Sequence, residues 1–194
     1  MITSRKELNQ YLAMDRARRG NDLPNLKDWI LRNEKWYLWR YVLSLRHVEY
    51  HKNKISVEGG IMCLHLLPFL FWFYRYKRLC FLLHLYIYPN SVGAGLMMYH
   101  IGGFTHVGKN VKIGKNCTIL PGVVFGNKHE EPDESPIIVG DNCYFGLGCK
   151  ILGSVRIGNN VTVGANSVVT KDIPDNAVVG GVPAKVIKIK DQHT

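Results

Sequence analysis

Apolar side chains return at every sixth residue through the C-terminal half of the chain. They form two runs of eleven residues in all, none of them polar: Ile101, Val107, Ile113, Ile119 and Phe125, then Val139, Phe145, Ile151, Ile157, Val163 and Val169. A glycine follows eight of them, at Gly102, Gly108, Gly114, Gly126, Gly140, Gly146, Gly158 and Gly164. A helix repeats about every 3.6 residues and an alternating strand about every 2, so neither element alone explains this period. A repeat this short predicts a solenoid.

Each six-residue unit has room for a short strand, an inward apolar side chain and a turn. Three units bring the chain back to its starting face, so one coil takes about eighteen residues. Successive coils would stack at the inter-strand spacing of about 4.8 Å. We expect the glycines to serve tight turns with positive φ, where larger residues would be strained. A β-sandwich rich in valine and glycine is the alternative, and the regular spacing argues against it.

One interruption breaks the repeat. Phe125 and Val139 lie fourteen residues apart, which is not a multiple of six. Residues 126–138 are therefore predicted to leave the solenoid as an excursion loop, and loops on a rigid scaffold commonly carry function. The acidic residues of this loop are Glu130, Glu131, Asp133 and Glu134. The solenoid is expected over residues 93–182, followed by a basic C-terminal tail over residues 183–194.

Residues 1–92 are predicted to form a helical region. Ser4 and Glu7 have the spacing of a capping box, which predicts a helix that begins there and runs to about Arg18. A second helix is expected over residues 25–51, where tryptophans and leucines form a broad apolar face.

The most apolar run of the chain, residues 61–74, closes this helical region. It is shorter than the roughly 20 residues that span a bilayer, and His65 and Pro68 interrupt it. Basic residues follow at once, at Arg75, Lys77 and Arg78. One interpretation is a helix buried in a subunit interface or against the solenoid. The other is a peripheral membrane contact through residues 61–78.

The formal charge of the 194-residue chain is +10, which favours anionic partners such as coenzyme A, an acidic membrane surface or nucleic acid. Nucleic acid is not expected, because the sequence has no helix-turn-helix, zinc or RNA-binding signature. The five cysteines lack Cys-x-x-Cys spacing, which argues for a reducing cytoplasm. Cys117, Cys143 and Cys149 are expected to be small buried hydrophobes within the repeat. With no secretory signal at the start, we expect a cytoplasmic location and leave membrane association open.

Several phrases of the repeat resemble those of the hexapeptide-repeat acyltransferases. They are Gly-Lys-Asn-Cys-Thr-Ile (114–119), Val-Gly-Asp-Asn-Cys-Tyr-Phe-Gly (139–146), Lys-Ile-Leu-Gly (150–153), Val-Gly-Ala-Asn-Ser-Val-Val-Thr-Lys-Asp-Ile-Pro (163–174) and Gly-Val-Pro-Ala-Lys (181–185). Within this family the chain is most similar to the serine acetyltransferases and their relatives in polysaccharide biosynthesis.

The resemblance implies an all-β left-handed parallel β-helix behind an N-terminal helical region. The handedness comes from the resemblance alone, because parallel crossovers are normally right-handed. The resemblance also implies a homotrimer with active sites between subunits, acetyl-CoA as the co-substrate and no metal.

Acetyl transfer from a thioester to an alcohol needs a base for the hydroxyl proton, and histidine suits this role near neutral pH. His100, in Tyr-His-Ile-Gly-Gly (99–103), resembles the segment that carries the catalytic histidine of serine acetyltransferases. Tyr99 stands where those enzymes usually have an aspartate, and the spacing to the next glycine differs by about one residue. This departure weakens the prediction of serine as the acceptor. His129, in the excursion loop, is the second catalytic candidate, and His106 is expected to be structural or interfacial.

The resemblance places the coenzyme in a groove between two subunits. Small residues there let the pantetheine arm approach the main chain closely, and lysines attract the phosphates. The matching positions are Gly146, Leu147, Gly164, Ala165, Thr170, Lys171, Lys185 and Lys188. The sequence contains no Walker-type glycine loop and no dinucleotide fingerprint.

These observations predict an acetyl-CoA-dependent O-acetyltransferase in which a histidine activates an acceptor hydroxyl for direct attack on the thioester. The acceptor predicted first is L-serine, as in cysteine biosynthesis, and the alternative is a sugar in capsular or other surface polysaccharide biosynthesis. A metal enzyme of the carbonic-anhydrase kind would need three converging histidines, and His100, His106 and His129 lack the usual close pairing. A non-catalytic trimeric scaffold is disfavoured because the coenzyme-binding positions match the family.

Overall fold

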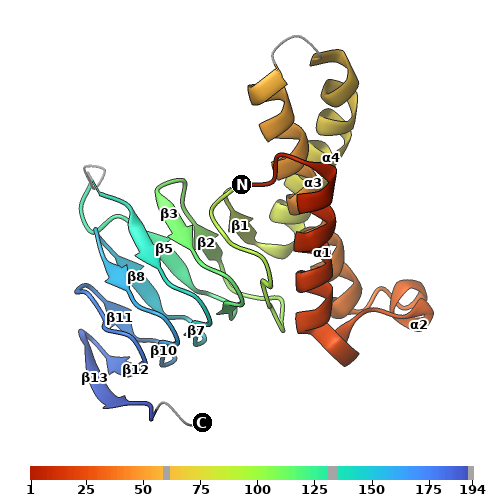
Figure 1. The fold of residues 1–194 in the computed structure, drawn as a ribbon. Helices are drawn as coiled ribbons and strands as arrows, with labels where there is room; N and C mark the ends of the chain where they lie inside the picture. Colours follow the sequence, from red (N-terminus) through yellow and green to blue (C-terminus); the bar gives the residue numbers. More distant parts are fainter. Residues whose placement is uncertain (59–61, 131–134, 192–194) are drawn as a thin grey trace.

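The computed structural model describes residues 1–58, 62–130 and 135–191. Helices occupy the N-terminal part and a solenoid of short strands the rest, as Figure 1 shows. The helices are α1 (Arg5–Arg19), a 3-10 turn (Gly20–Asp22), α2 (Leu26–Ile30), α3 (Glu34–Glu58) and α4 (Met62–Leu83). α3 and α4 form an antiparallel hairpin that extends past the solenoid, and α1 packs against α3.

Helix α1 begins where the sequence predicts. The Ser4 hydroxyl accepts a hydrogen bond from the Glu7 amide, and the Glu7 carboxylate accepts one from the Ser4 amide at 2.9 Å, so both halves of the capping box form. The same carboxylate accepts a bond from the Thr3 amide at 2.7 Å. These bonds, first of all the one from Thr3, lower the pKa of Glu7 to about 2.

The single helix expected over residues 25–51 is wrong, because two helices with a sharp break occupy this segment. α2 stops after five residues, where the chain turns through Arg32 with a left-handed φ of 50°. The Asn33 side chain donates to the Asp28 carboxylate at 2.8 Å and closes the turn. α3 begins directly after this turn and continues past the expected end. Neither glycine nor proline marks the break, which is why the sequence does not predict it.

Helix α4 includes Pro68, which interrupts the apolar run of the sequence but does not end the helix. It ends at Leu83, and the chain turns at His84, whose φ is 53°, into the first strand. The segment after Leu79 is therefore helical at first and then extended. Of the helices in the described ranges, none is long and apolar enough to pass through a bilayer.

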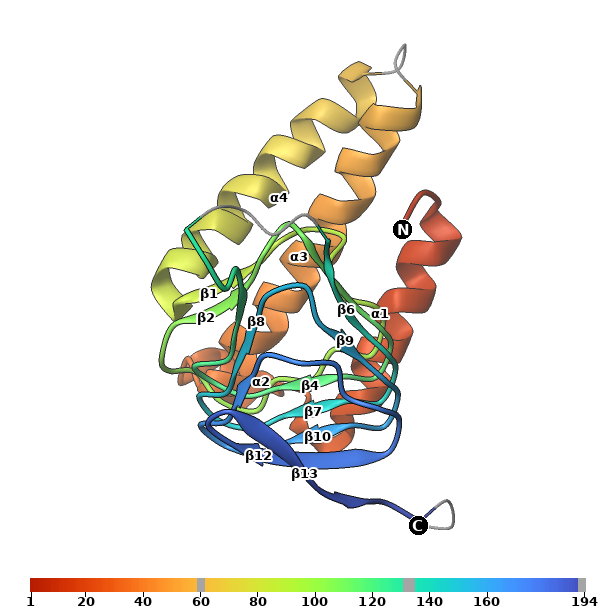
Figure 2. The ribbon, with the colours of Figure 1, turned by 90° about the vertical axis from the view of Figure 1, so that its left-hand side faces the viewer.

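Three parallel sheets form the three faces of the solenoid, seen in Figure 2. The first face consists of β1 (Leu85–Ile87), β2 (Thr105–Val107), β5 (Val124–Gly126), β8 (Lys150–Leu152) and β11 (Val168–Val169). The second consists of β3 (Val111–Ile113), β6 (Ile137–Val139) and β9 (Arg156–Ile157). The third consists of β4 (Thr118–Ile119), β7 (Tyr144–Phe145), β10 (Thr162–Val163), β12 (Ala177–Gly181) and β13 (Ala184–Ile189). β13 is antiparallel to β12 and occupies part of the segment expected as a tail.

The strand register confirms a coil of eighteen residues. His106 pairs with Val124, and Lys150 pairs with Val168, in both cases eighteen residues on. Across the excursion loop, Val124 pairs with Lys150, twenty-six residues on, so the loop adds eight residues to one coil. The predicted solenoid is confirmed, and the extra residues lie between β5, which ends at Gly126, and β6, which begins at Ile137. The bounds 126–138 of the excursion loop stay a prediction. The division of the chain at residues 92 and 182 stays a prediction.

Most residues of the six-residue repeat face the interior. Phe125 and Phe145 are fully buried, with ring centroids 4.9 Å apart in an edge-to-face contact. Cys117, Cys143 and Cys149 are buried among them as predicted. Burial raises the pKa of the Cys149 thiol to about 12, so this thiol is unreactive.

The first coil begins before the repeat is visible in the sequence. β1 pairs with β2 at an offset of twenty residues rather than eighteen. Val92 then forms a ladder bridge with Ile113, and Met97 forms one with Thr118. Ile101, the first residue of the repeat, is only partly buried and lies outside the strands. The irregular spacing of this coil explains why a search for a fixed period misses it.

The glycines of the repeat serve close packing more than positive φ. Gly114 and Gly140 are not among the residues with positive φ, but a Cβ on Gly114 would lie 2.6 Å from the carbonyl oxygen of Gly140. The expected role in left-handed turns is therefore wrong for these residues and holds for Gly102, whose φ is 137°. Glycines outside the repeat positions, such as Gly122 and Gly148, take several left-handed positions, and asparagines within the repeats take five more, because asparagine tolerates this conformation better than most residues. These asparagines are Asn116, Asn142, Asn160, Asn166 and Asn176.

Three buried charges hold the helices against the first coil. Arg46 of α3 contacts Asp15 of α1 at 2.8 Å and Glu49 at 3.1 Å, and all three residues are almost inaccessible to solvent. Arg46 also donates to the carbonyl oxygens of Val92 at 2.9 Å and Gly93 at 2.7 Å. Burial disfavours the charge of Arg46, but the two carboxylates outweigh it and raise the pKa. We call these three residues and their contacts the charge clasp.

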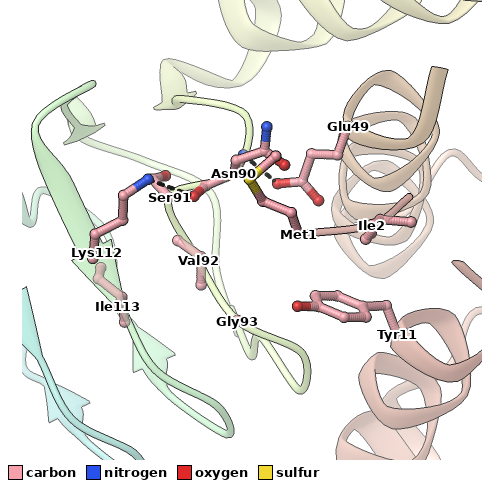
Figure 3. A pocket seen from close by; sticks show the side chains of 10 residues that line it. All are labelled: Met1, Ile2, Tyr11, Glu49, Asn90, Ser91, Val92, Gly93, Lys112 and Ile113. Atoms are coloured by element: carbon pink, nitrogen blue, oxygen red, sulfur yellow. Dashed lines mark hydrogen bonds between the residues drawn. The ribbon is translucent and has the colours of Figure 1, made fainter. Parts of the chain in front are cut away.

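The acidic partners of the charge clasp bind the same segment. Asp15 accepts hydrogen bonds from the amides of Gly95 at 2.7 Å and Leu96 at 2.9 Å. Glu49 accepts one from the Asn90 amide at 2.7 Å, and Figure 3 shows this contact across the junction. The position of the helices on the first coil is thus fixed by hydrogen bonds to main-chain groups.

Candidate active site at the first coil

Most of the predicted site residues lie on two edges of the solenoid. One joins the third face to the first, and Gly103, Gly122 and Gly148 stack along it. A Cβ on Gly103 would lie 3.2 Å from Gly122, and one on Gly122 would lie 3.3 Å from Gly148. We call this the glycine edge. The other joins the first face to the second and carries the excursion loop between β5 and β6, and we call it the loop edge.

His100 lies on the glycine edge, between the bridge at Met97 and strand β2. Its side chain is 67% exposed. Nδ1 lies 3.2 Å from Oε2 of Glu34, the first residue of α3, and the other oxygen of Glu34 accepts a hydrogen bond from the Ile101 amide. Glu34 therefore holds the imidazole and the backbone beside it. With Nδ1–H donated to Glu34, Nε2 keeps its lone pair free to accept a proton, as a general base requires.

A cavity of about 120 Å³ opens beside this pair. Its polar lining residues are Arg19, Asp22, Glu34, Lys35, Tyr99 and His100. Arg19 is only 4% exposed, and its Nε and Nη2 have no hydrogen-bond partner within the described part of the chain. Nη1 makes a long contact of 3.5 Å with the Met98 carbonyl oxygen. Burial lowers the pKa of Arg19, so this guanidinium is poorly compensated at the wall of the cavity.

Sequence reasoning missed both Glu34 and Arg19. Glu34 is 66 residues away from His100 along the chain and belongs to no repeat. An acidic residue at the start of a helix already has an explanation in the helix dipole, so nothing singles it out. Arg19 is one of several basic residues at the end of α1. Only the docking of the helices on the first coil reveals either residue.

The structure does not bring the two predicted histidines together. His129 is exposed in the excursion loop, on the loop edge, whereas His100 lies on the glycine edge. Three acidic loop residues, Glu131, Asp133 and Glu134, lie outside the described residues. His106 is partly buried and its ring stacks on Phe104 with centroids 5.7 Å apart. It lines a second cavity of about 370 Å³ on the loop edge, beside Asn127 and Ser135.

Part of the predicted coenzyme site lies in line with His100. Gly146 and Leu147 follow β7, and Gly164 and Ala165 follow β10, so the two pairs stack on the glycine edge. A Cβ on Gly146 would lie 2.7 Å from the Ala165 amide nitrogen, which shows how closely the coils approach. Leu147 is 52% exposed and Ala165 is exposed as well. At about 4.8 Å per coil, they lie roughly 10 and 14 Å from the first coil along the axis.

The remaining predicted coenzyme residues lie elsewhere on the chain. Thr170 and Lys171 follow β11 and therefore sit on the loop edge. Lys185 and Lys188 belong to β13, at the outer margin of the third face, and all three lysines are exposed. Within the ranges that the structure describes, no group of three or more His, Cys, Asp or Glu side chains is arranged to hold a metal ion.

The repeat region matches a known family. Residues 105–128 and 136–171 match the family model described as hexapeptide repeat of succinyl-transferase. The serine acetyltransferase of Staphylococcus aureus strain Mu50 is 36% identical over 103 residues, which cover 53% of this chain and 48% of that protein. The serine acetyltransferase of Staphylococcus epidermidis strain RP62A is 37% identical over 103 residues, with the same coverage. The chain spans about half the length of the curated relatives it matches.

Solved serine acetyltransferases resemble nearly the whole chain. The structure from Brucella abortus strain S19 has a TM-score of 0.71 at 24% identity, covering 95% of this chain and 70% of that one. A structure from the same strain in complex with coenzyme A has a TM-score of 0.70 at 24% identity, covering 96% and 70%. The Neisseria gonorrhoeae structure in complex with serine has a TM-score of 0.66 at 25% identity, covering 95% and 71%. Residues 105–128 and 136–171 therefore carry hexapeptide repeats, and the chain has the fold of the solved serine acetyltransferases, a left-handed β-helix behind N-terminal helices.

Proposed function

We propose that this chain is an acetyl-CoA-dependent O-acetyltransferase whose general base is His100. The observation that carries the proposal is the contact of His100 with Glu34, which leaves one imidazole nitrogen free on the glycine edge. The reaction class comes from the serine acetyltransferases that the chain resembles.

His100 Nε2 takes the proton of the acceptor hydroxyl as the hydroxyl oxygen forms a bond to the acetyl carbonyl carbon. The carbon–sulfur bond then breaks, and the imidazolium returns the proton to the departing thiol. Glu34 keeps the ring in one orientation and stabilises the imidazolium between the two proton transfers. Both substrates bind together in this mechanism, so no covalent acyl-enzyme is needed.

Bound acetyl-CoA would supply the acetyl group as an activated thioester. The glycine edge fits an extended pantetheine arm, because exposed main chain at Leu147 and Ala165 lies on the same edge as His100. The lysines predicted to meet the phosphates lie on other parts of the chain. A homotrimer in which the glycine edge of one subunit meets the loop edge of the next would bring Lys171 and His129 toward this groove. A cytoplasmic location accords with the supply of acetyl-CoA.

Arg19 supports L-serine as the acceptor. A buried guanidinium with free donors at the wall of a small cavity suits a carboxylate, which it can bind in a bidentate manner. One observation favours the second candidate, a sugar hydroxyl in surface polysaccharide biosynthesis. Tyr99, which replaces the aspartate expected beside the base, is 44% exposed and offers an aromatic surface where a charge would otherwise bind an amino group.

The test is release of the coenzyme A thiol from acetyl-CoA, measured with L-serine and separately with neutral saccharides. We expect turnover with L-serine, formation of O-acetylserine and a loss of about 10²–10⁴-fold in kcat/KM for His100→Ala. His84→Asn is the matched control, because His84 is exposed and its φ of 53° suits asparagine. Turnover with a saccharide but not with serine would select the second candidate. Absence of transfer to either class of acceptor contradicts the proposal.

A further inference from the structure

Helix α4 carries a long apolar stripe on its outer side. The exposed fractions are 72% for Leu64, 73% for Leu67, 59% for Phe71, 70% for Tyr74 and 77% for Phe81. Spacings of three, four and seven residues place these side chains on one face of the helix, over about 26 Å. We call this surface the α4 face. Exposed apolar surfaces of this extent mark a contact with another body.

The opposite side of α4 already has its partners. Tyr76, Leu79, Cys80 and Leu83 are buried in the main core. The Tyr76 hydroxyl donates to the Ile87 carbonyl oxygen at 2.5 Å and ties α4 to the first strand. The exposed apolar side chains of the α4 face are therefore not needed for packing α4 onto the rest of the protein.

A basic cleft of about 360 Å³ lies beside the α4 face and shares residues with it. Four arginines line the cleft: Arg32, Arg40, Arg75 and Arg78. Its aromatic lining consists of Trp36, Tyr37, Phe71 and Tyr74. No acidic residue is among the described residues that line it, and α4 itself contains none. We call it the arginine cleft.

Within the described ranges, no ion pair with a carboxylate is formed by an arginine of this cleft. Burial lowers the pKa of Arg75, and the like charge of nearby Arg40 lowers it further. The Nε of Arg75 has no hydrogen-bond partner among the residues that the structure describes. Arg40 lies over the Trp36 ring at 4.2 Å and Arg75 over the Trp72 ring at 5.2 Å, so aromatic faces hold the guanidinium groups in place. A cluster of arginines beside an exposed apolar surface is suited to bind several anionic groups that lie next to an apolar environment.

We propose that the α4 face and the arginine cleft dock this protein on the surface of a bilayer that contains anionic phospholipids. Leu67, Phe71 and Phe81 enter the boundary of the acyl chains, and the arginines meet the lipid phosphates. Tyr74 lies at the level of the headgroups, where a ring with a polar tip is favoured. A second copy of the chain fits this surface poorly, because face-to-face packing would bring two sets of arginines together without a carboxylate between them.

The test is sedimentation of the full chain with vesicles made of equal parts of phosphatidylglycerol and phosphatidylcholine, against vesicles of phosphatidylcholine alone. We expect binding to the anionic vesicles that weakens as salt is added, because surface charges are screened. The double variant Leu67→Glu and Phe81→Glu should lower the partition coefficient by at least tenfold. Arg78→Gln alone should lower it by about fivefold. Ile187→Glu is the control, because Ile187 is 69% exposed on the solenoid and should leave binding unchanged.

Equal binding to both kinds of vesicle, or full binding by the double variant, overturns the proposal. A third result would also overturn the proposal. In it, the protein does not sediment with either kind of vesicle, and light scattering shows that it self-associates unless it carries the double substitution. The α4 face would then be a contact between copies of the chain. Acetyl transfer to a soluble acceptor is measured on the same samples. The double variant should keep this activity, so the docking result stands apart from the proposed reaction.

Discussion

The solenoid and the helical hairpin place the same kinds of residue in opposite environments. In the solenoid, Phe125 and Phe145 are fully enclosed. In the hairpin, Phe81 is 77% exposed and Phe71 is 59% exposed. The solenoid closes its own core coil upon coil, whereas the helices are positioned by the charge clasp and leave an apolar side uncovered. The solenoid is therefore the scaffold, and the helices supply contacts to other groups, including the candidate base.

The charge clasp gives the largest expected effect on the helical side. Arg46→Met leaves Asp15 and Glu49 buried without their cation, which should lower the free energy of unfolding by about 3–5 kcal/mol. All four tryptophans lie in α2, α3 and α4, so denaturation followed by tryptophan fluorescence reports on the helices. Lys35→Met is the control, because the Lys35–Asp22 pair at 2.8 Å is exposed and screened by solvent, so its loss should change the free energy of unfolding far less. Equal effects of the two variants would contradict the claim that the charge clasp stabilises the helical region.

Phe125 and Phe81 should respond very differently to truncation, because one is enclosed in the solenoid and the other is exposed on α4. Phe125→Ala should lower the free energy of unfolding by about 3–5 kcal/mol, because it leaves a cavity against Phe145 in the solenoid. Phe81→Ala should change it by less than about 0.5 kcal/mol, because the side chain is exposed. Far-ultraviolet circular dichroism in denaturant measures both. A large loss for Phe81→Ala would mean that the α4 face is covered in solution.

The smallest expected effect is a pH dependence of the hairpin. Burial, with nearby positive charge from Arg5 and the neighbouring histidines, lowers the pKa of His47 and of His51 to about 4. His47 also stacks on Trp72 at 4.1 Å, and the His51 and His65 Nδ1 atoms are 2.9 Å apart. In the unfolded chain these histidines have a pKa near 6.5, so as pH falls the unfolded state binds protons before the folded state does. Stability is therefore full above about pH 6.5, falls down to about pH 4, and is level below that.

The expected loss is about 1 kcal/mol for each histidine, after allowance for the partial exposure of these sites. Denaturation curves by tryptophan fluorescence at about pH 7 and about pH 5 measure it. The variant His47→Phe should reduce the difference in the free energy of unfolding between these two pH values by about half. An unchanged slope in that variant would exclude His47 as a source of the pH dependence.

The solenoid could be predicted from the sequence, because every six-residue unit has the same pattern of an inward apolar residue followed by a turn. Phe125 and Val139 even locate the excursion loop by their spacing alone. The start of the first coil at β1 was not predicted because the spacing there is irregular, and the break at Arg32 was not predicted because no glycine or proline marks it.

The candidate site was only half predictable. His100 is found through a short phrase that resembles a family motif, but its place on the glycine edge is seen only in the structure, because the spacing of the first coil is irregular. Glu34 and Arg19 come from helices whose position is set by the charge clasp, a contact between residues far apart in the chain. No periodic pattern encodes such a contact, so the partner of the base can be found only in the folded chain.

The most direct test of the central claim is a double-mutant cycle on His100 and Glu34, read as acetyl transfer from acetyl-CoA. If Glu34 acts by positioning the base, Glu34→Gln should lower kcat by roughly tenfold or more with little change in KM. In the His100→Ala background the same change should then have no further effect, because nothing is left to position. Independent, multiplying losses of rate in the double variant would contradict the account.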